Sequence, residues 1–539
     1  MKQTVGDIFA DELKSHGVKR IFGIPGGGSS VDFIDACMTR DIKFELVQQE
    51  SSAAIMAVVS GEITSSIGSC ISIMGPGATN LASGASYAFL ERHPLLVFTE
   101  CYGLPLSSHM TMQKIDHQSL FSTVSKGSKI LDENQTKSLI RDAIKISRDE
   151  RPGPYHLDIP NNLISKEYLG DTENFQEDKF SESDFSSIDR IAETIDKSDF
   201  PLVILGPLVH RENLSDSIKK MLEKSGIAFM VTSKARGVIS EDHPFYGGIV
   251  SGVYSENTFE DSMISKSDLI IGIGFDRSEL LSPWKHQQPY IELDSIYIPE
   301  EEKVTEPYLN AFGDLEKIIK NITDQIKNRQ CWSKDDLKNF WAETRFLLGV
   351  GTEEFNPGSV IGLSREMTPN KTIISTEAGV YGRVGLYAWK VENKNTYYDS
   401  SGANTMGFSI PAIIAASLEI SDQKSVAFVG DGGFMMKVSE LETIARLGLK
   451  PVILVFNDGT LGMIRIKQSQ KGLPRAGVDL YQPDLVKIAQ SFGGEGYIVN
   501  DLISFKDAFD KALENDKFTI IDLRFDPDVY ASPIKLIRG

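Results

Sequence analysis

The stretch from residue 425 to residue 462 constrains the fold of this chain more than any other. A short apolar run, Ser-Val-Ala-Phe-Val at 425–429, leads into Gly-Asp-Gly-Gly at 430–433 and then into a helix-like segment. A second apolar run begins at Pro451 and ends in a polar turn, Asn-Asp-Gly at 457–459. This order is typical of neighbouring strands in a parallel sheet with helical crossovers. Both turns are therefore expected at the carboxyl-terminal edge of one sheet.

The two turns carry residues that suit a phosphate and a cation. Glycines after a strand let the backbone approach a phosphate closely, and the start of a helix offers free N–H groups to an anion. Asp431 and Asp458 supply oxygen ligands, which Mg²⁺ prefers and shares with phosphate. The same residues also fit an ordinary strand–turn–helix with a capping aspartate, and from the turns alone that alternative stays open.

Composition excludes several classes of protein. A chain of 539 residues is too long for one core, so two to four domains are expected. The net charge of −19 argues against nucleic acid or an anionic membrane surface as a partner. The four cysteines form no Cys-x-x-Cys pair, which suits a reducing compartment. Without a signal-peptide pattern or a run of 18 apolar residues, we expect a cytoplasmic protein with no membrane partner.

Strand-like and helix-like segments alternate along nearly the whole chain. We predict an N-terminal domain at 1–165, a polar linker at 165–185, a middle domain at 186–325, and a C-terminal domain at 345–530. A charged helical connection precedes the last domain, at about 327–368. In the middle domain, Gly-Ile-Gly at 272–274 is weak support for a dinucleotide site, because a third glycine is missing.

Several segments, in the right order, resemble the signatures of one family, the thiamine diphosphate (ThDP) enzymes. The Gly-Asp-Gly at 430–432 and the Asn-Asp pair at 457–458 match its metal-binding signature, and Thr-Met-Gly-Phe-Ser-Ile-Pro at 405–411 resembles another. The remaining matches are Phe-Gly-Ile-Pro-Gly at 22–26, Gln-Glu-Ser-Ser-Ala-Ala-Ile-Met-Ala at 49–57, Gly-Pro-Gly-Ala-Thr-Asn-Leu at 75–81, Gln-Lys-Ile-Asp at 113–116 and Gly-Pro-Tyr-His-Leu-Asp-Ile-Pro at 153–160.

The resemblance implies an α/β fold of three doubly wound, Rossmann-like domains. The N-terminal domain would bind the pyrimidine of the cofactor, the C-terminal domain would bind its diphosphate, and a middle domain would lie between them in the sequence. It implies ThDP and Mg²⁺ as cofactors, with Asp431, Asp458 and Thr460 as metal ligands; Asp458 stands where asparagine is commoner. The residues implied to hold the cofactor are Gly26, Glu50, Asn80, Asn404, Met406, Gly430, Asp431, Gly432, Gly433, Asp458, Leu461, Gly462, Met463 and Ile464.

Two residues are implied to be catalytic. Glu50 matches the family's glutamate, whose carboxyl group hydrogen-bonds the aminopyrimidine ring, although the preceding residue is Gln49 rather than the usual histidine. Gln113 matches a position near the reacting carbon. From sequence alone, a helix-start carboxylate and a solvated side chain are the plainer interpretations of these two residues.

The resemblance further implies active sites between subunits, in a homodimer or homotetramer, and a small 2-oxo acid as substrate. Residues 271–284 look more like the flavin-free, catabolic-type acetolactate synthases, so FAD is possible but not favoured. Residues 467–478 are similar to the helix beside their site. The first hypothesis is a carboligase that decarboxylates a 2-oxo acid, with pyruvate expected from the resemblance, and ligates the activated aldehyde to a second carbonyl compound. The alternatives are a simple 2-oxo acid decarboxylase, a flavin-dependent oxidase and a non-catalytic binding subunit.

Overall fold

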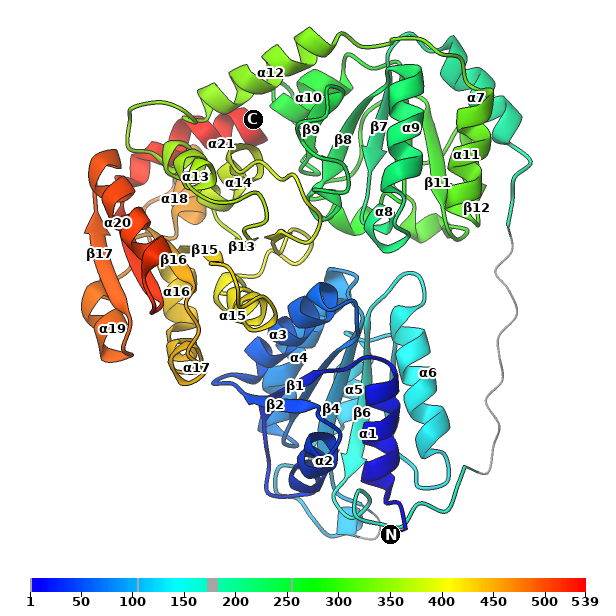
Figure 1. Ribbon diagram of the computed structural model, residues 1–539, viewed down its shortest axis with the longest axis vertical. Coiled ribbons are helices and arrows are strands. Elements are labelled where there is room, and N and C mark those ends of the chain that lie inside the picture. Colours follow the sequence, from blue (N-terminus) through cyan, green and yellow to red (C-terminus); the bar gives the residue numbers. More distant parts are fainter. Residues whose placement is uncertain (1, 104–105, 172–182, 254) are drawn as a thin grey trace.

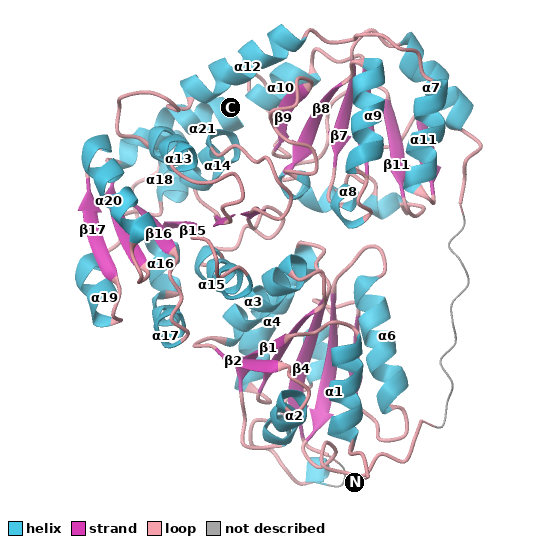
Figure 2. Ribbon diagram, viewed as in Figure 1, coloured by secondary structure: helices cyan, strands magenta, loops and turns pink. Residues whose placement is uncertain are grey.

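A computed structural model describes residues 2–103, 106–171, 183–253 and 255–539. It contains three sheets of six strands, and every strand pairs in parallel with its neighbours (Figures 1 and 2). Helices cover both faces of each sheet, because parallel strands are joined by crossovers that place helices there. The predicted fold class is confirmed.

The N-terminal sheet has the order β2-β1-β3-β4-β6-β5. Its strands are β1 Arg20–Ile24, β2 Lys43–Leu46, β3 Gly68–Ser72, β4 Leu95–Cys101, β5 Gly127–Ile130 and β6 Pro154–Pro160. The helices are α1 Val5–Ser15, α2 Ser29–Met38, α3 Glu50–Ile63, α4 Pro76–Leu90, α5 His117–Phe121 and α6 Thr136–Arg148. Helices α1, α2 and α6 pack on one face, and α3 and α4 pack on the other.

The middle sheet has the order β12-β11-β10-β7-β8-β9. Its strands are β7 Pro201–Leu205, β8 Ala228–Thr232, β9 Tyr246–Val250, β10 Leu269–Ile273, β11 Tyr290–Asp294 and β12 Leu309–Phe312. The helices are α7 Ile188–Lys197, α8 Leu208–Arg211, α9 Ser215–Ser225, α10 Phe259–Ile264 and α11 Leu315–Gln325. Helix α12, Lys334–Leu347, then leads from this sheet to the C-terminal one (Figure 1).

The C-terminal sheet has the order β14-β13-β15-β16-β18-β17. Its strands are β13 Ile374–Ser375, β14 Tyr397–Tyr398, β15 Val426–Gly430, β16 Val452–Asn457, β17 Glu495–Val499 and β18 Thr519–Arg524. The helices are α13 Pro357–Glu366, α14 Val380–Ala388, α15 Ser409–Glu419, α16 Asp431–Met436, α17 Leu441–Arg446, α18 Gly462–Gln470, α19 Leu485–Ser491, α20 Leu502–Glu514 and α21 Ala531–Arg538. Strands β15 and β16 are neighbours, as the sequence predicts.

Helices α3 and α15 join the N-terminal and C-terminal parts of the chain (Figure 1). Small side chains on α3, among them Ala53, Ala54 and Ala57, let α15 approach closely, and its Ile413 and Ile414 are fully buried. Polar contacts flank this core, since the carboxylate of Glu419 accepts hydrogen bonds from Arg20 and Ser60 over 2.8 and 2.7 Å. The position of the N-terminal sheet relative to the C-terminal one is therefore set largely by this interface.

Some local expectations are changed by the structure. The helix after Gly433 is short, because α16 ends at Met436 and gives way to a single 3₁₀ turn before α17. The helical stretch expected at 467–478 ends at Gln470; Gly472 and Gly477 have positive φ there, which a helix interior does not allow. Helix α21 lies beyond the predicted C-terminal domain, which ended at residue 530.

The predicted domain limits remain predictions, although the three sheets occupy residues 20–160, 201–312 and 374–524. The predicted linker at 165–185 falls mostly on residues 172–182, which lie outside the described residues. Among the helices that the structure describes, none has both the length and the apolar character needed to cross a bilayer.

Candidate active site

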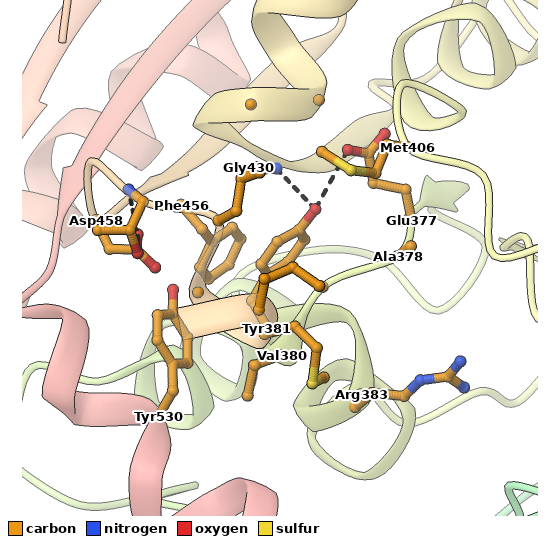
Figure 3. A pocket seen from close by; sticks show the side chains of 18 of the residues that line it. Glu377, Ala378, Val380, Tyr381, Arg383, Met406, Gly430, Phe456, Asp458 and Tyr530 are labelled. Atoms are coloured by element: carbon orange, nitrogen blue, oxygen red, sulfur yellow. Dashed lines mark hydrogen bonds between the residues drawn. The ribbon is translucent and has the colours of Figure 1, made fainter. Parts of the chain in front are cut away.

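A cavity of about 420 Å³ opens at the carboxyl ends of β13, β15 and β16 (Figure 3). It lies where ligands bind in open α/β sheets. Every C-terminal residue predicted to bind the cofactor or the metal lines it: Asn404, Met406, Gly430, Asp431, Gly432, Gly433, Asp458, Thr460, Leu461, Gly462, Met463 and Ile464. These residues come from three separate segments, at 404–406, 430–433 and 458–464, so the tertiary fold brings the predicted set together.

Asp431 and Asp458 lie in the two turns at this edge. The Asp431 carboxylate accepts hydrogen bonds from the backbone N–H groups of Gly432 and Gly459, both over 2.8 Å. The Asp458 carboxylate accepts from the N–H and the hydroxyl of Thr460, over 2.8 and 2.7 Å. Burial and the charge of Asp458 raise the pKa of Asp431 to about 7. Two half-buried carboxyl groups that destabilise one another's charge favour a cation between them.

Side-chain and backbone hydrogen bonds fix the turn that carries Asp458. Asn457 is fully buried, where its side chain donates to Asp522 over 2.8 Å and accepts from Gln482 over 3.0 Å. Asn457 therefore fixes the backbone, while Asp458 faces the cavity. Two backbone hydrogen bonds, Leu461 N to Val478 O and Leu480 N to Gly459 O, each of 2.8 Å, tie the same turn to the following loop.

Tyr381 links two walls of the cavity (Figure 3). Its hydroxyl accepts a hydrogen bond from the Gly430 N–H over 2.7 Å and lies 3.4 Å from Glu377 Oε1. Its ring stacks on Phe456, with centroids 4.7 Å apart and planes 11° apart. Glu377 in turn accepts from the Ser409 N–H over 3.1 Å, and burial raises its pKa to about 8. Glu377 is thus predominantly protonated at neutral pH.

Two further segments complete the cavity. Helix α18 begins at Gly462 with no side-chain cap, so the first N–H groups of the helix are available to an anion. Opposite it, Asn404 and Met406 lie in the segment before α15, and the side chain of Asn404 accepts a hydrogen bond from Arg383. Asn404 has a positive φ of 49°, so this segment turns sharply just before Met406.

The N-terminal candidates form a second group, at the carboxyl edge of the N-terminal sheet. Glu50, the first residue of α3, is buried, and its Oε2 accepts a hydrogen bond from Asn80 Nδ2 over 3.1 Å. Gln113 lies against the turn before α4, where a Cβ on Gly75 would come 2.4 Å from its carbonyl oxygen. A Cβ on Gly26 would lie 2.9 Å from Ile73 in the same region. The structure therefore gathers Gly26, Glu50, Asn80 and Gln113 around β1, β3 and their turns.

Within one chain, this second group does not meet the first. None of its four residues is among the described residues that line the cavity. Gln49 lies nearer to the C-terminal part, because its side chain accepts a hydrogen bond from Lys437 over 2.6 Å. A single protomer thus carries two separate halves of the predicted site.

Sequence reasoning missed some of the lining residues. Tyr530 and Arg538 reach the cavity from the C-terminal segment, and Glu377 and Arg383 reach it from the segment around α14. The spacing of Tyr530, Ile534 and Ile537, which are all buried, is a helical signal that could have revealed α21. Nothing local in the sequence places that helix beside α14, where it packs.

The lining residues fit ThDP with Mg²⁺. Between the described residues, no cluster of three or more His, Cys, Asp or Glu side chains could hold a metal unaided. A cation at Asp431 and Asp458 would then complete its shell with carbonyl and phosphate oxygens, as Mg²⁺ does. The absence of a side chain at Gly432 lets a ligand approach the backbone closely there. A Cβ on Gly432 would lie 3.3 Å from both Met406 and Leu461. The cavity thus offers carboxylates, free N–H groups and glycines on facing walls.

The relatives of the chain agree with this site. It is 27% identical to the probable acetolactate synthase large subunit of Methanococcus aeolicus, over 96% of this chain and 91% of the relative. It is 26% identical to the acetolactate synthase of Bacillus subtilis, over 98% and 94%. The catabolic acetolactate synthase of Raoultella terrigena is 22% identical, over 96% and 94%. Over nearly its whole length, the chain thus resembles proteins that are named as acetolactate synthases.

Three family models match successive parts of the chain. The N-terminal TPP binding domain of thiamine pyrophosphate enzymes matches residues 3–120, their central domain matches 188–322, and their C-terminal TPP binding domain matches 377–523. These matches together cover most of the sequence and follow the order of the three sheets. The chain therefore belongs to the family of thiamine pyrophosphate enzymes.

Proposed function

We propose that this enzyme decarboxylates a 2-oxo acid, pyruvate above all, and joins the resulting fragment to a second carbonyl compound, with ThDP held through Mg²⁺. The observation that carries the proposal is the cavity itself, in which Asp431 and Asp458 lie beside the uncapped N-terminus of α18. The names of the relatives, acetolactate synthases, supply the reaction class. When bound, ThDP supplies a nucleophilic carbon and an electron sink.

Different residues of the chain would bind the metal, the diphosphate and the rings of the cofactor. Asp431, Asp458 and the Thr460 carbonyl would hold Mg²⁺, and the N–H groups of Gly462 and Met463 would hold the diphosphate. Met406 and the Asn404 carbonyl, on the facing wall, would orient the rings. The buried carboxyl group of Glu50 would hold a proton between its oxygen and the pyrimidine ring nitrogen.

We further propose that the active site forms between two copies of the chain. Its support is the separation of Glu50 and Asn80 from the cavity within one protomer. A two-fold axis would bring the N-terminal group of each copy to the cavity of the other, so both sites form at once. The oligomer proposed is a homodimer or a pair of such dimers.

A flavin is not part of the proposal, because ion pairs fill part of the carboxyl edge of the middle sheet. Asp276, just after β10, lies 3.3 Å from Arg92 Nε and 3.4 Å from Arg151 Nε. Arg151 also pairs with Glu302 over 2.7 Å. These side chains occupy the part of the sheet edge around Asp276, where ligands of open α/β sheets can lie. A Cβ on Gly206, after β7, would come 2.1 Å from the Gly274 carbonyl oxygen, so that turn is closed.

Product analysis tests the proposal. The purified chain is incubated with pyruvate, ThDP and Mg²⁺, and the products are identified, with the Asp431→Ala variant as the control. Acetolactate and carbon dioxide from the unaltered chain alone are the expected result. Acetaldehyde in place of acetolactate would make the enzyme a simple decarboxylase, and flavin absorption in the purified chain would overturn the flavin-free assignment.

A further inference from the structure

His117 is a buried residue that the proposed function has not used. It is the first residue of α5, and its side chain lies between β4, β6 and the turn that starts α4. Its Nδ1 lies 2.7 Å from Asp158 Oδ1, and its Nε2 accepts a hydrogen bond from the Gly75 N–H over 3.1 Å. A ring nitrogen that accepts from a backbone N–H carries no proton. In this arrangement Nε2 of His117 is an acceptor, and Nδ1 is placed to donate to Asp158.

The other partners of Asp158 keep its carboxylate in place. It accepts from the hydroxyl of Thr99 and, over 2.8 Å, from Gln118 Nε2. Thr99 is flanked by His156, whose Nε2 lies 2.8 Å from the Thr99 hydroxyl and whose pKa is lowered to about 4 by burial. Asp158, Thr99 and His156 are all nearly or fully buried. Such a fully satisfied polar network rigidifies the groups at its ends.

The free end of this network is the turn at Gly75. Gly75 has a φ of +67° and precedes Pro76, the first residue of α4. One turn into the helix, Asn80 donates to Glu50, and a Cβ on Gly77 would lie 3.4 Å from Glu50 Oε1. Gln113, with a φ of +57°, packs its backbone against Gly75. The hydrogen bond from Gly75 to His117 thus anchors the turn that contacts both proposed catalytic residues.

We propose that His117, oriented by Asp158, is a positioning residue that holds the 75–80 turn, and through it Asn80, against Glu50. This inference rests on the proposed function only for its effect on turnover. Without the imidazole, the buried Gly75 N–H loses its acceptor, and an unpaired buried N–H destabilises the turn that carries it. The turn then relaxes toward other arrangements. A displacement of about 1 Å at a reacting centre can lower a rate on the order of 100-fold.

Hydrogen exchange tests the structural part on the unliganded chain, whatever its activity. In His117→Ala, exchange in a peptide covering 73–81 should rise at least about tenfold, while peptides around β15 and β16 stay unchanged. His109, exposed on the other side of Gln113, provides the control variant His109→Ala. Asp158→Asn keeps the volume, but its amide N–H can donate to Nδ1 and shift the ring proton to Nε2, where it would face the Gly75 N–H, so it should have the same effect. Unchanged exchange at 73–81 in both variants would overturn the proposal.

A double-mutant cycle with Asn80 tests whether His117 acts through the turn. His117→Ala should lower turnover roughly 10- to 100-fold in the unaltered chain and less than about threefold in an Asn80→Ala background. Equal losses in both backgrounds would mean that His117 supports only the general fold, and the positioning role would be wrong. If the chain turns over no 2-oxo acid, the proposed function fails, while the exchange data still decide the anchoring of the turn.

Discussion

The carboxylate of Asp431 accepts a hydrogen bond from the backbone N–H of Gly459 over 2.8 Å, which ties the turn after β15 to the turn after β16. The bond brings the Asp431 carboxyl group into the turn that carries Asp458. The two aspartates can lie in neighbouring turns because the crossover between them returns the chain to the adjacent strand of the sheet. Cofactor binding is expected to depend on this pair.

Replacing Asp431 should remove cofactor binding, because the variant Asp431→Ala loses a metal ligand. We expect the affinity for ThDP in the presence of Mg²⁺ to fall at least about tenfold, as measured by isothermal titration calorimetry. The matched variant, Asp458→Asn, keeps an oxygen ligand in the other turn and should bind within a few-fold of the unaltered chain. Equal affinity in the Asp431→Ala variant would remove Asp431 from the metal site.

Glu50→Gln should separate binding from turnover. The amide keeps the size of the side chain but not the acidity of the carboxyl group, so a proton-holding role is lost. Turnover of pyruvate is expected to drop on the order of 100-fold or more, while ThDP affinity changes by less than about threefold. Steady-state rates and calorimetry on the same preparation measure the two quantities. A variant as active as the unaltered chain would exclude Glu50 from the chemistry.

Mixing two inactive variants should restore activity if sites form between chains. In a heterodimer of Glu50→Gln and Asp431→Ala protomers, one of the two sites combines an intact Glu50 with an intact Asp431. Random exchange of protomers is expected to recover about one quarter of the unaltered turnover. The measurement is the rate after co-refolding or co-expression, with each variant alone as the control. No recovery in a mixture shown to contain heterodimers would contradict the two-chain site.

Glu377 should make the stability of the chain fall as pH rises. Burial raises its pKa to about 8 from an ordinary value of 4.5. Between these values the folded chain keeps a proton that the unfolded chain releases, so the free energy of unfolding decreases with pH. Glu377→Gln should lack this contribution, which is on the order of a few kcal/mol across the window. Melting temperatures of both chains from pH 4.5 to 8.5 test it; parallel curves would be the contrary outcome.

Tyr381→Phe should destabilise the chain through one hydrogen bond. The hydroxyl accepts from the Gly430 N–H, and its loss leaves that group unpaired at a cost of about 1–3 kcal/mol. Stacking on Phe456 is retained by the phenylalanine ring. Chemical denaturation measures the difference. The control is Tyr481→Phe, at a side chain that is 89% exposed, which should change stability by no more than about 0.5 kcal/mol.

Much of the site could be predicted from the sequence, because its parts are local. Asp431 and Asp458 each follow an apolar strand directly, and the glycines beside them indicate turns. Alternation of strands and helices was enough to predict three parallel sheets. Glu50 falls at the junction between a strand and a helix, which is a local feature as well.

The sequence by itself therefore determined the fold class and the residues at the strand ends, because hydrophobic periodicity and turn residues act over a few positions. Only the tertiary structure decided which residues complete the lining of the cavity and which residues hold the N-terminal turns in place. Tyr530 and Arg538 come from the two ends of α21, and His117 at the start of α5 meets Asp158 on β6. These contacts depend on how helices pack on sheets, through side chains far apart in the sequence, and no local pattern encodes such packing.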